Sequence, residues 1–178
     1  MQEKHYEVII IGGGITGSAL AYVLAEFSGI ENIALLEKYE GLATLNSKAS
    51  ANSQTIHCGD IETNYDLQKA TEVKRKADMI VKYCQKHGYE NKFLFQGQKM
   101  ALGVGESEVE LIKDRFEKFK ELYPYLQLFD KEELKKIEPK LVFDGRGEER
   151  AEDIVAMGVQ SGVYTTIDYG AMANSFVQ

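Results

Sequence analysis

The feature that most constrains the fold is a glycine-rich turn between a short apolar run and a helical pattern. Residues 6–11 are mostly apolar and β-branched, which predicts a buried parallel strand. Residues 12–17, GGGITG, contain the spacing G-x-G-x-x-G, and residues 16–27 then carry apolar side chains at helical spacing. A second strand is predicted over residues 32–36 and is followed by Glu37, 20 residues after the last glycine of the motif. This order predicts a Rossmann-like βαβ unit that binds a dinucleotide.

Each glycine of this turn meets a geometric need of a bound dinucleotide. Gly12 permits the tight turn, Gly14 lets the backbone approach a pyrophosphate, and Gly17 lets the helix pack closely on the strand. The pyrophosphate is expected at the helix N-terminus, where free N–H groups and the helix dipole favour an anion. Glu37 can accept hydrogen bonds from both ribose hydroxyls and disfavours the extra phosphate of NADP. The motif by itself does not distinguish FAD from NAD, and a glycine-rich turn in a generic strand–helix unit is the alternative.

The composition narrows the class of protein and its partners. The 178 residues are 44% hydrophobic and 28% charged, which is typical of a soluble globular protein. A net charge of -7 argues against a nucleic-acid partner, because such a surface does not neutralise phosphates. No apolar run approaches the roughly 20 residues that span a bilayer. The two cysteines, Cys58 and Cys84, match neither a disulfide framework nor a metal cluster, so we expect a reducing cytoplasmic setting and no metal.

A long irregular passage, residues 38–65, follows the second predicted strand. In a plain NAD-binding fold another crossover helix and strand would come soon, and neither pattern is present here. A long segment of this kind is usually functional or disordered, and its few charges argue against disorder. Its stretch ANSQTIHCGDIETNY, residues 51–65, is rich in hydrogen-bonding side chains. We therefore expect this stretch to lie along a large cofactor.

The order of residues in this passage resembles one family, the malate:quinone oxidoreductases, within the FAD-dependent oxidoreductases that are similar to D-amino-acid oxidase. The resemblance runs along the whole chain and is nearest to the forms from epsilon-type proteobacteria. The segments QKMALGVG at 98–105 and FDKEELKKIEP at 129–139 also have family counterparts. Many flavoproteins share the glycine turn, so the later block is the more specific part. The residues that carry the resemblance are the glycine turn, Glu37, Lys38, Asn52, Thr55, His57, Glu62, Asn64 and Tyr65.

The resemblance implies that FAD is the cofactor and that the stretch 51–65 faces the flavin. His57 would be the catalytic base on the substrate side of the flavin, because the reference pKa of histidine, about 6.5, suits proton transfer at neutral pH. Glu62 and Asn64 would lie nearby on the same side. A surface histidine without a site role is the alternative for His57, and Cys58 is either a redox thiol or a small packing residue. The expected cofactor-binding residues are Gly12, Gly14, Ile15, Thr16, Gly17, Glu37, Lys38, Ser50, Asn52, Ser53 and Thr55.

The reaction implied by the resemblance is oxidation of (S)-malate to oxaloacetate, with electrons passed to a membrane quinone. We expect a cytoplasmic protein with peripheral contact at the inner face of the cytoplasmic membrane. The alternatives are an FAD enzyme for 2-hydroxyglutarate or an amino acid, an inactive nucleotide-binding fragment, and an NAD-dependent dehydrogenase, against which the irregular passage counts. The spacing selects none of the arginines that could meet the malate carboxylates, which are Arg75, Arg115, Arg146 and Arg150.

The expected fold is α/β and has two parts. A Rossmann-like FAD-binding βαβ unit occupies residues 1–90, the beginning of an interleaved α+β substrate-binding domain occupies 91–165, and residues 166–178 start a return to the FAD domain. Because family members are much longer, the chain is expected to be an amino-terminal fragment. The other expected elements are a helix over 66–87, one or two strands in 93–102, a helix in 105–123 with a capping box of Ser107 and Glu110, a short helix capped by Asp130 and Glu133, strands around 142 and over 159–164, and a helix over 169–177.

Overall fold

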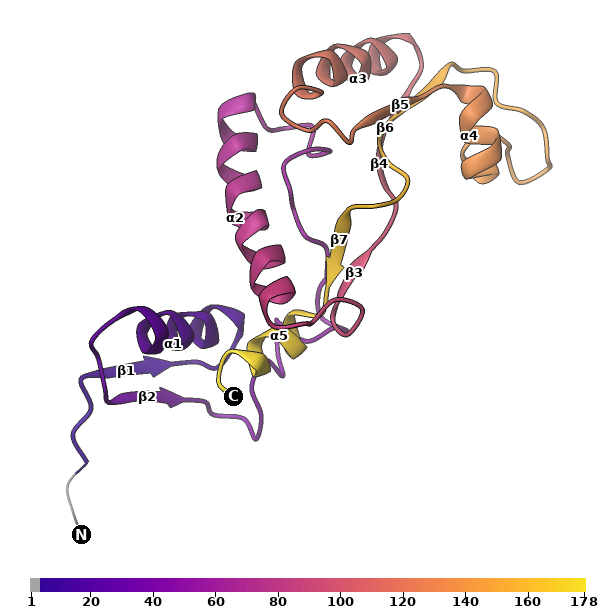
Figure 1. The fold of residues 1–178 in the computed structure, drawn as a ribbon. Helices are drawn as coiled ribbons and strands as arrows, with labels where there is room; N and C mark the ends of the chain where they lie inside the picture. Colours follow the sequence, from indigo (N-terminus) through magenta and orange to yellow (C-terminus); the bar gives the residue numbers. More distant parts are fainter. Residues whose placement is uncertain (1–3) are drawn as a thin grey trace. The chain divides into compact units, whose positions relative to one another are not determined.

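The computed structural model describes residues 4–178, whose backbone contacts divide the chain into two compact units (Figure 1). The first unit contains the described residues up to Thr55, together with Glu90–Leu94 and Thr166–Gln178. The second contains Ile56–Tyr89 and Phe95–Thr165. Residues before 90 therefore fall in both compact units, and the assignment of residues 1–90 to the FAD-binding domain stays a prediction. The loop that carries the candidate site residues crosses from one unit to the other after Thr55.

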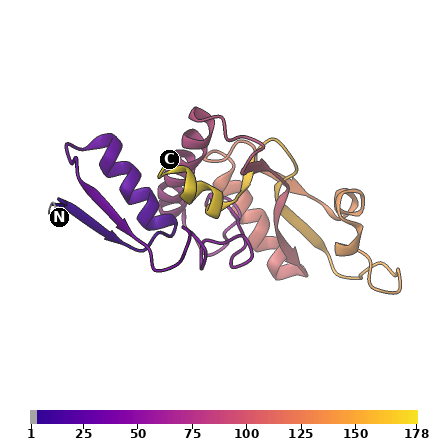
Figure 2. The same ribbon diagram turned by 90° about the horizontal axis from the view of Figure 1, so that it is seen from below.

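The first unit contains the βαβ element that the glycine turn predicts. β1 and β2 pair in parallel, with Val8 opposite Ile33 and Ile11 opposite Leu36. α1 lies along one face of this pair (Figures 1 and 2). The strand, helix and second strand expected from the sequence are therefore confirmed, as is the closing helix. The elements of this unit are β1 (Val8–Ile11), α1 (Ile15–Phe27), β2 (Ile33–Leu36) and α5 (Tyr169–Ser175).

Close packing of α1 on β1 depends on Gly17. A Cβ atom at this position would lie 1.9 Å from the carbonyl oxygen of Gly12 and 3.3 Å from the Ile10 side chain. Any larger residue would therefore push the helix away from the strand. Farther along α1, Tyr22 packs against Phe176 with ring centroids 5.2 Å apart, so the carboxyl-terminal segment covers the same helix.

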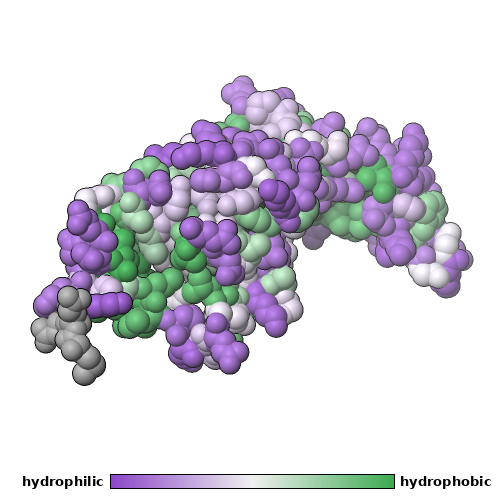
Figure 3. Space-filling model, turned by 60° about the horizontal axis from the view of Figure 1, so that its bottom comes forward, coloured by the Kyte–Doolittle hydropathy of each residue, from purple (hydrophilic) through white to green (hydrophobic). Residues whose placement is uncertain are grey.

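The other face of the β1–β2 pair is apolar and exposed. Side chains alternate between the faces of a strand, so Ile9 and Ile11 point away from the face that carries Ile10. The side chains of Ile9, Ile11 and Leu36 are 55%, 86% and 54% exposed. Figure 3 shows the hydrophobic area on this part of the chain. Parallel sheets normally have both faces covered, whereas these apolar side chains are exposed in the described chain.

The second unit is built around β6, whose six residues are all buried. β4 and β5 flank β6 in an antiparallel sheet. On one face, Val155 and Met157 belong to the core that α3 covers, and on the other, Ile154 and Ala156 pack with Leu134 of α4. The elements of this unit are α2 (Leu67–Lys86), β4 (Lys99–Val104), α3 (Glu106–Phe119), β5 (Gln127–Phe129), α4 (Lys131–Ile137), the 3₁₀ helix η1 (Pro139–Leu141) and β6 (Ile154–Val159). The remaining strands, β3 (Leu94–Gln96) and β7 (Tyr164–Ile167), form a two-stranded sheet.

Two of the predicted helix starts in the second unit are confirmed. The Asp66 carboxylate accepts a hydrogen bond from the Lys69 N–H at the start of α2. At the start of α4, the Asp130 carboxylate accepts from the Glu133 N–H, and the Glu133 carboxylate accepts from the Asp130 N–H. This reciprocal pair is the capping box that the sequence predicts.

The capping box predicted for Ser107 and Glu110 is wrong. α3 begins one residue before Ser107, and its N-cap is Gly105, which has φ of 78° and no side-chain cap. The chain enters α3 directly from β4, and the Gly105 N–H donates to the carbonyl oxygen of Asp153. Pairing with a strand segment distant in sequence therefore fixes the start of this helix.

The strands predicted around 142 and over 159–164 are also wrong. Residues 139–141 form η1, and near them the structure shows only the isolated bridge between Phe143 and Glu149. β6 ends at Val159 and β7 begins at Tyr164, so the predicted strand covers the turn between two real ones. β6 itself reads as a continuous apolar run because both of its faces are buried.

Candidate functional site

An open cavity of about 800 Å³ lies beside the glycine turn in the first unit. A second cavity, of about 370 Å³, shares Gly12 and Gly14 with it and extends along the loop after β2. The two cavities therefore adjoin at this turn, where a nucleotide is expected. Besides β1, the first is lined by Gly12, Gly14, Ile15, Thr16, Gly17, Leu20, Asn46, Ser47, Asn52 and Tyr169. The second adds Leu36, Glu37, Lys38, Tyr39, Ala43, Thr44 and Leu45.

The backbone of the turn leaves room for a ligand. Gly12 has φ of +102°, and a Cβ there would meet no heavy atom within 4 Å. The N-cap of α1 is Gly14, which has no side chain to fill the helix end. A helix leaves its first N–H groups without intrahelical acceptors, and these groups attract anions. The glycine turn therefore fits the pyrophosphate of a dinucleotide.

Ser47 reaches this helix end from the irregular passage. Its hydroxyl oxygen accepts a hydrogen bond of 3.0 Å from the Ile15 N–H, and its side chain is buried. The sequence reasoning missed this residue, and nothing in the local pattern distinguishes it from Ser50, which is exposed. The position of Ser47 depends on how the loop folds back over the turn.

Glu37 holds the glycine turn from the end of β2. Its Oε2 accepts the Gly13 N–H at 2.8 Å, and its Oε1 accepts the Tyr39 N–H at 3.0 Å. These backbone hydrogen bonds, that from Gly13 above all, lower the pKa of Glu37, so the carboxylate is ionised at neutral pH. Each carboxylate oxygen has a second lone pair. Glu37 can therefore brace the turn and still accept from ribose hydroxyls.

The other residues expected to bind the cofactor are distributed along the loop. Asn52 lines the larger cavity and donates from Nδ2 to the carbonyl oxygen of Asn46 at 2.7 Å. Lys38 lines the smaller cavity, with its ammonium 4.8 Å from the centroid of the Tyr39 ring. The side chains of Ser50 and Ser53 are exposed, and neither residue lines these two cavities.

Thr55 connects the loop to the carboxyl-terminal segment. It forms an antiparallel bridge with Thr166, and its carbonyl oxygen accepts from the Tyr169 hydroxyl at 3.2 Å. Gln54 supports the same junction, since its side-chain oxygen accepts from the Tyr169 N–H at 2.7 Å. The end of the loop is therefore held within the first unit.

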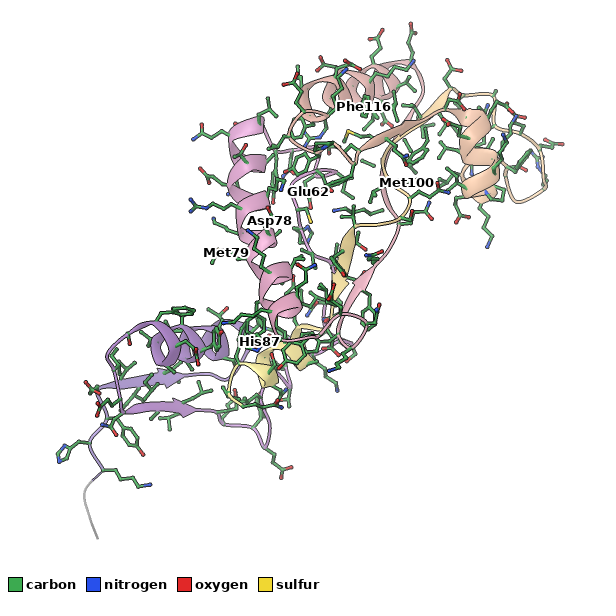
Figure 4. The ribbon with its side chains drawn as sticks, viewed as in Figure 1. Glu62, Asp78, Met79, His87, Met100 and Phe116 are labelled. Atoms are coloured by element: carbon green, nitrogen blue, oxygen red, sulfur yellow. The ribbon has the colours of Figure 1, made fainter. Side chains whose placement is uncertain are left out.

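His57 and Glu62 meet at the beginning of the second unit, where Figure 4 labels Glu62 on the segment that precedes α2. Nδ1 of His57 lies 2.9 Å from Oε1 of Glu62. The His57 side chain is 63% exposed, whereas that of Glu62 is only 15% exposed. Asn64 is exposed. The histidine ring is thus exposed to solvent on one side and held by a largely buried carboxylate on the other.

Arg115 is used to hold the backbone of this segment. Its two terminal nitrogens donate to the carbonyl oxygens of Tyr65 and Glu62, at 2.7 and 2.5 Å. The guanidinium carbon lies 3.8 Å from the centroid of the Phe119 ring. Burial lowers the pKa of Arg115, although the Glu62 charge opposes this shift. Arg115 is one of the arginines considered for a substrate carboxylate, and in this structure its terminal nitrogens bind backbone carbonyl oxygens instead.

A buried polar cluster lies under the same loop. Lys99 Nζ donates to Asp60 Oδ1 at 2.7 Å, and the Tyr125 hydroxyl donates to Asp60 Oδ2 at 2.8 Å. The Tyr123 hydroxyl donates to the carbonyl oxygen of Cys58 at 2.8 Å. Burial raises the pKa of the Cys58 thiol, which favours the packing role over the redox role.

Two general features of the described chain bear on its partners. No helix within residues 4–178 combines the length and the apolar character that crossing a membrane requires. Within the same range, no three or more histidine, cysteine, aspartate or glutamate side chains gather as they would around a metal ion.

Comparison with known proteins gives consistent results. The family described as FAD dependent oxidoreductase matches residues 7–169. A probable malate:quinone oxidoreductase of Campylobacter jejuni is 54% identical over all of this chain and 40% of its own length. A probable malate:quinone oxidoreductase of Helicobacter pylori is 41% identical over 97% of this chain and 38% of its own length. The chain therefore spans about 40% of the curated relatives it matches.

Among solved structures, the L-alpha-glycerophosphate oxidase of Mycoplasma pneumoniae with FAD bound has a similar fold. Its TM-score is 0.62 at 23% sequence identity, over 98% of this chain and 42% of that one. At this identity the likeness concerns the fold, which is the α/β architecture expected from the sequence.

Proposed function

Because the chain belongs to the FAD-dependent oxidoreductase family, we propose that its protein oxidises (S)-malate to oxaloacetate and passes the electrons to a quinone. The observation that carries this proposal is the 54% identity, over the whole chain, to a relative named for malate and quinone. The match covers the whole chain and therefore includes residues of both units. The corresponding cofactor is FAD.

The ADP part of FAD is proposed to lie at the glycine turn. The hollow beside Gly12 and Gly14, the open end of α1 and the ionised Glu37 support this position. The pyrophosphate would lie at the first turn of α1, beside Ile15 and Thr16, where the Ile15 N–H already donates to Ser47 and the Thr16 N–H would donate to the ligand. FAD, when bound, accepts the hydride from the malate carbon that bears the hydroxyl group.

His57 is proposed as the catalytic base of this reaction. The hydride carries away the two electrons of the carbon–hydrogen bond. At the same time the hydroxyl proton passes to Nε2 of the imidazole, and the carbon–oxygen single bond becomes a carbonyl. Two observations support this role. The ring of His57 is exposed, and His57 lies two residues after Thr55, where the loop leaves the first unit. Glu62 and Asn64 are proposed to lie on the same substrate side.

Transfer to a quinone implies contact with a membrane, because respiratory quinones dissolve in the bilayer. The proposed location is therefore the cytoplasm, with peripheral contact at the inner face of the cytoplasmic membrane. Separation of a cell lysate into soluble and membrane fractions, before and after a high-salt wash, tests this location.

The decisive experiment uses the full-length protein that contains this chain, reconstituted with FAD under anaerobic conditions. Malate is added and the visible flavin absorption is followed, with 2-hydroxyglutarate and amino acids as parallel additions. We expect bleaching with malate alone. Bleaching with 2-hydroxyglutarate or an amino acid instead would reject malate as the substrate and identify the protein as an FAD enzyme for that other compound. Failure to bind flavin would reject the cofactor site, and an electron acceptor assay with a soluble quinone tests the final step.

A further inference from the structure

We propose that Glu62 is a positioning residue for His57, which it holds in the tautomer whose Nε2 accepts the substrate proton. This inference rests on the proposed role of His57 and deepens it. A neutral histidine carries its proton on one of two ring nitrogens, and only the unprotonated nitrogen can act as a base. The nitrogen that carries the proton is set by the partner of the ring.

The hydrogen bond between the two residues determines this choice. An ionised carboxylate can only accept, so the 2.9 Å contact makes Nδ1 of His57 the donor and Glu62 Oε1 the acceptor. The lone pair then lies on Nε2, at the far side of the ring. Because the His57 side chain is largely exposed, this lone pair remains accessible to a substrate hydroxyl.

The position of Glu62 is itself fixed by α3. Arg115 grips the carbonyl oxygens of Glu62 and Tyr65 with both terminal nitrogens, and its guanidinium stacks on Phe119. The Tyr65 N–H also donates to the Glu62 carbonyl oxygen at 3.2 Å, which closes a turn. The backbone at Glu62 is thus bonded to α3. The Glu62 carboxylate can therefore hold the His57 imidazole in one orientation.

Within the described chain, the second carboxylate oxygen of Glu62 is buried without a hydrogen bond of its own. Among the described residues Oε2 has no hydrogen-bond partner although it is buried, and the same is true of Nε of Arg115. An unsatisfied buried polar atom costs free energy, although the Glu62 charge also favours the charged form of the Arg115 guanidinium. The same charge would stabilise the imidazolium that forms when His57 accepts a proton, as a carboxylate stabilises a catalytic histidine in other enzymes.

The first test measures the tautomer without measuring activity. The full-length protein is labelled with ¹⁵N at histidine, and the ring nitrogens are observed by NMR at a pH where the imidazole is neutral. His57→Ala identifies the signals. We expect the Nδ1–H tautomer in the unaltered protein and a shift toward the Nε2–H tautomer in Glu62→Leu, which has a similar size but no acceptor. An unchanged tautomer in Glu62→Leu would overturn the inference.

A matched control and a second variant separate charge from geometry. Glu132→Gln removes another glutamate that pairs with a cation, Lys135, on the exposed surface of α4 and should leave the His57 signals unchanged. Glu62→Gln keeps a hydrogen-bond acceptor but removes the charge. It should keep the tautomer and still reduce turnover, because the imidazolium loses its carboxylate.

The second test is a kinetic double-mutant cycle with malate. We expect Glu62→Leu to lower kcat by about a hundredfold to a thousandfold, within the roughly 10²–10⁴-fold that general acid–base catalysis typically contributes. Because Glu62 acts through His57, the same substitution should cause no further loss in a His57→Ala background. An equal loss in both backgrounds would show an independent role and overturn the inference. Flavin content and melting temperature confirm that each variant is folded.

The two tests also separate this inference from the proposed function. If His57→Ala retains the turnover of the unaltered protein, the assignment of His57 as the base fails. The NMR measurement still decides whether Glu62 sets the tautomer of His57, because it does not depend on malate or on turnover.

Discussion

Lys99 Nζ lies 2.7 Å from Asp60 Oδ1, and the two side chains are 8% and 0% exposed. The Tyr125 hydroxyl completes the site by donating to the other carboxylate oxygen. A charge buried this deeply is stable only while its partners remain, so removal of one partner leaves the other uncompensated. Asp60 belongs to the loop that carries His57, so its bond to Lys99 of β4 anchors that loop in the second unit.

We expect Lys99→Met to lower the free energy of unfolding by about 3–5 kcal/mol, because Asp60 is left buried without its cation. The control is Lys118→Met, which removes the cation from a pair with Asp114 in which both side chains are about 60% exposed. That change should cost less than about 1 kcal/mol. Urea denaturation followed by circular dichroism gives both values. Equal losses would show that Lys99 and Asp60 do not act as a buried pair.

Gly17→Ala should reduce flavin binding and stability together. The new Cβ would lie 1.9 Å from the Gly12 carbonyl oxygen, so α1 must move away from the turn that receives the pyrophosphate. Gly29→Ala is the matched control, because a Cβ there meets no heavy atom within 4 Å. Flavin absorbance per protein after gel filtration provides the measurement. Full flavin retention in Gly17→Ala would contradict the packing argument.

The Cys84 thiol should make stability fall in alkaline solution. Burial raises the pKa of this thiol from 9.0 to about 11. The unfolded chain therefore releases the proton first, so this contribution is fully present below pH 9 and is lost as the pH rises through 11.

Comparison with Cys84→Ala isolates this effect from other titrations. The stability difference between the unaltered protein and the variant, measured by thermal melting from pH 7 to pH 11, should decrease across that window. A difference that is constant with pH would contradict the expected shift. Cys84 should also resist alkylation at pH 8 until the protein unfolds, since the thiolate is the reactive form.

The exposed apolar face of the β1–β2 pair should make the 178-residue chain self-associate. Ile11→Lys places a charge on this face at the carboxyl end of β1 and should reduce both association in sedimentation velocity and binding of a hydrophobic dye. Leu111→Lys is the control, because Leu111 is 67% exposed on α3 in the second unit. Equal effects of the two substitutions would show that general surface charge, rather than this face, controls association.

The sequence by itself determined the parts of this protein whose causes are local. The glycine spacing dictates the turn after β1 because Gly12 and Gly17 must come together within a few residues. The capping box of Asp130 and Glu133 likewise closes within one helical turn. The order of residues from Asn52 to Tyr65 was enough to indicate the family, because residue order can be read from the sequence whatever the fold of the loop.

Tertiary structure decided which residues meet when they are far apart in the chain. Asp60 and Lys99 are 39 positions apart, and no periodicity links them. Ser47, rather than Ser50, reaches the end of α1 because of the path of the loop. Ser107 does not cap α3, because pairing of the preceding residues with the strand segment near Asp153 starts the helix at Glu106. The physical reason is common to all three: a contact between distant residues depends on the packing of whole elements, which local side-chain preferences do not encode.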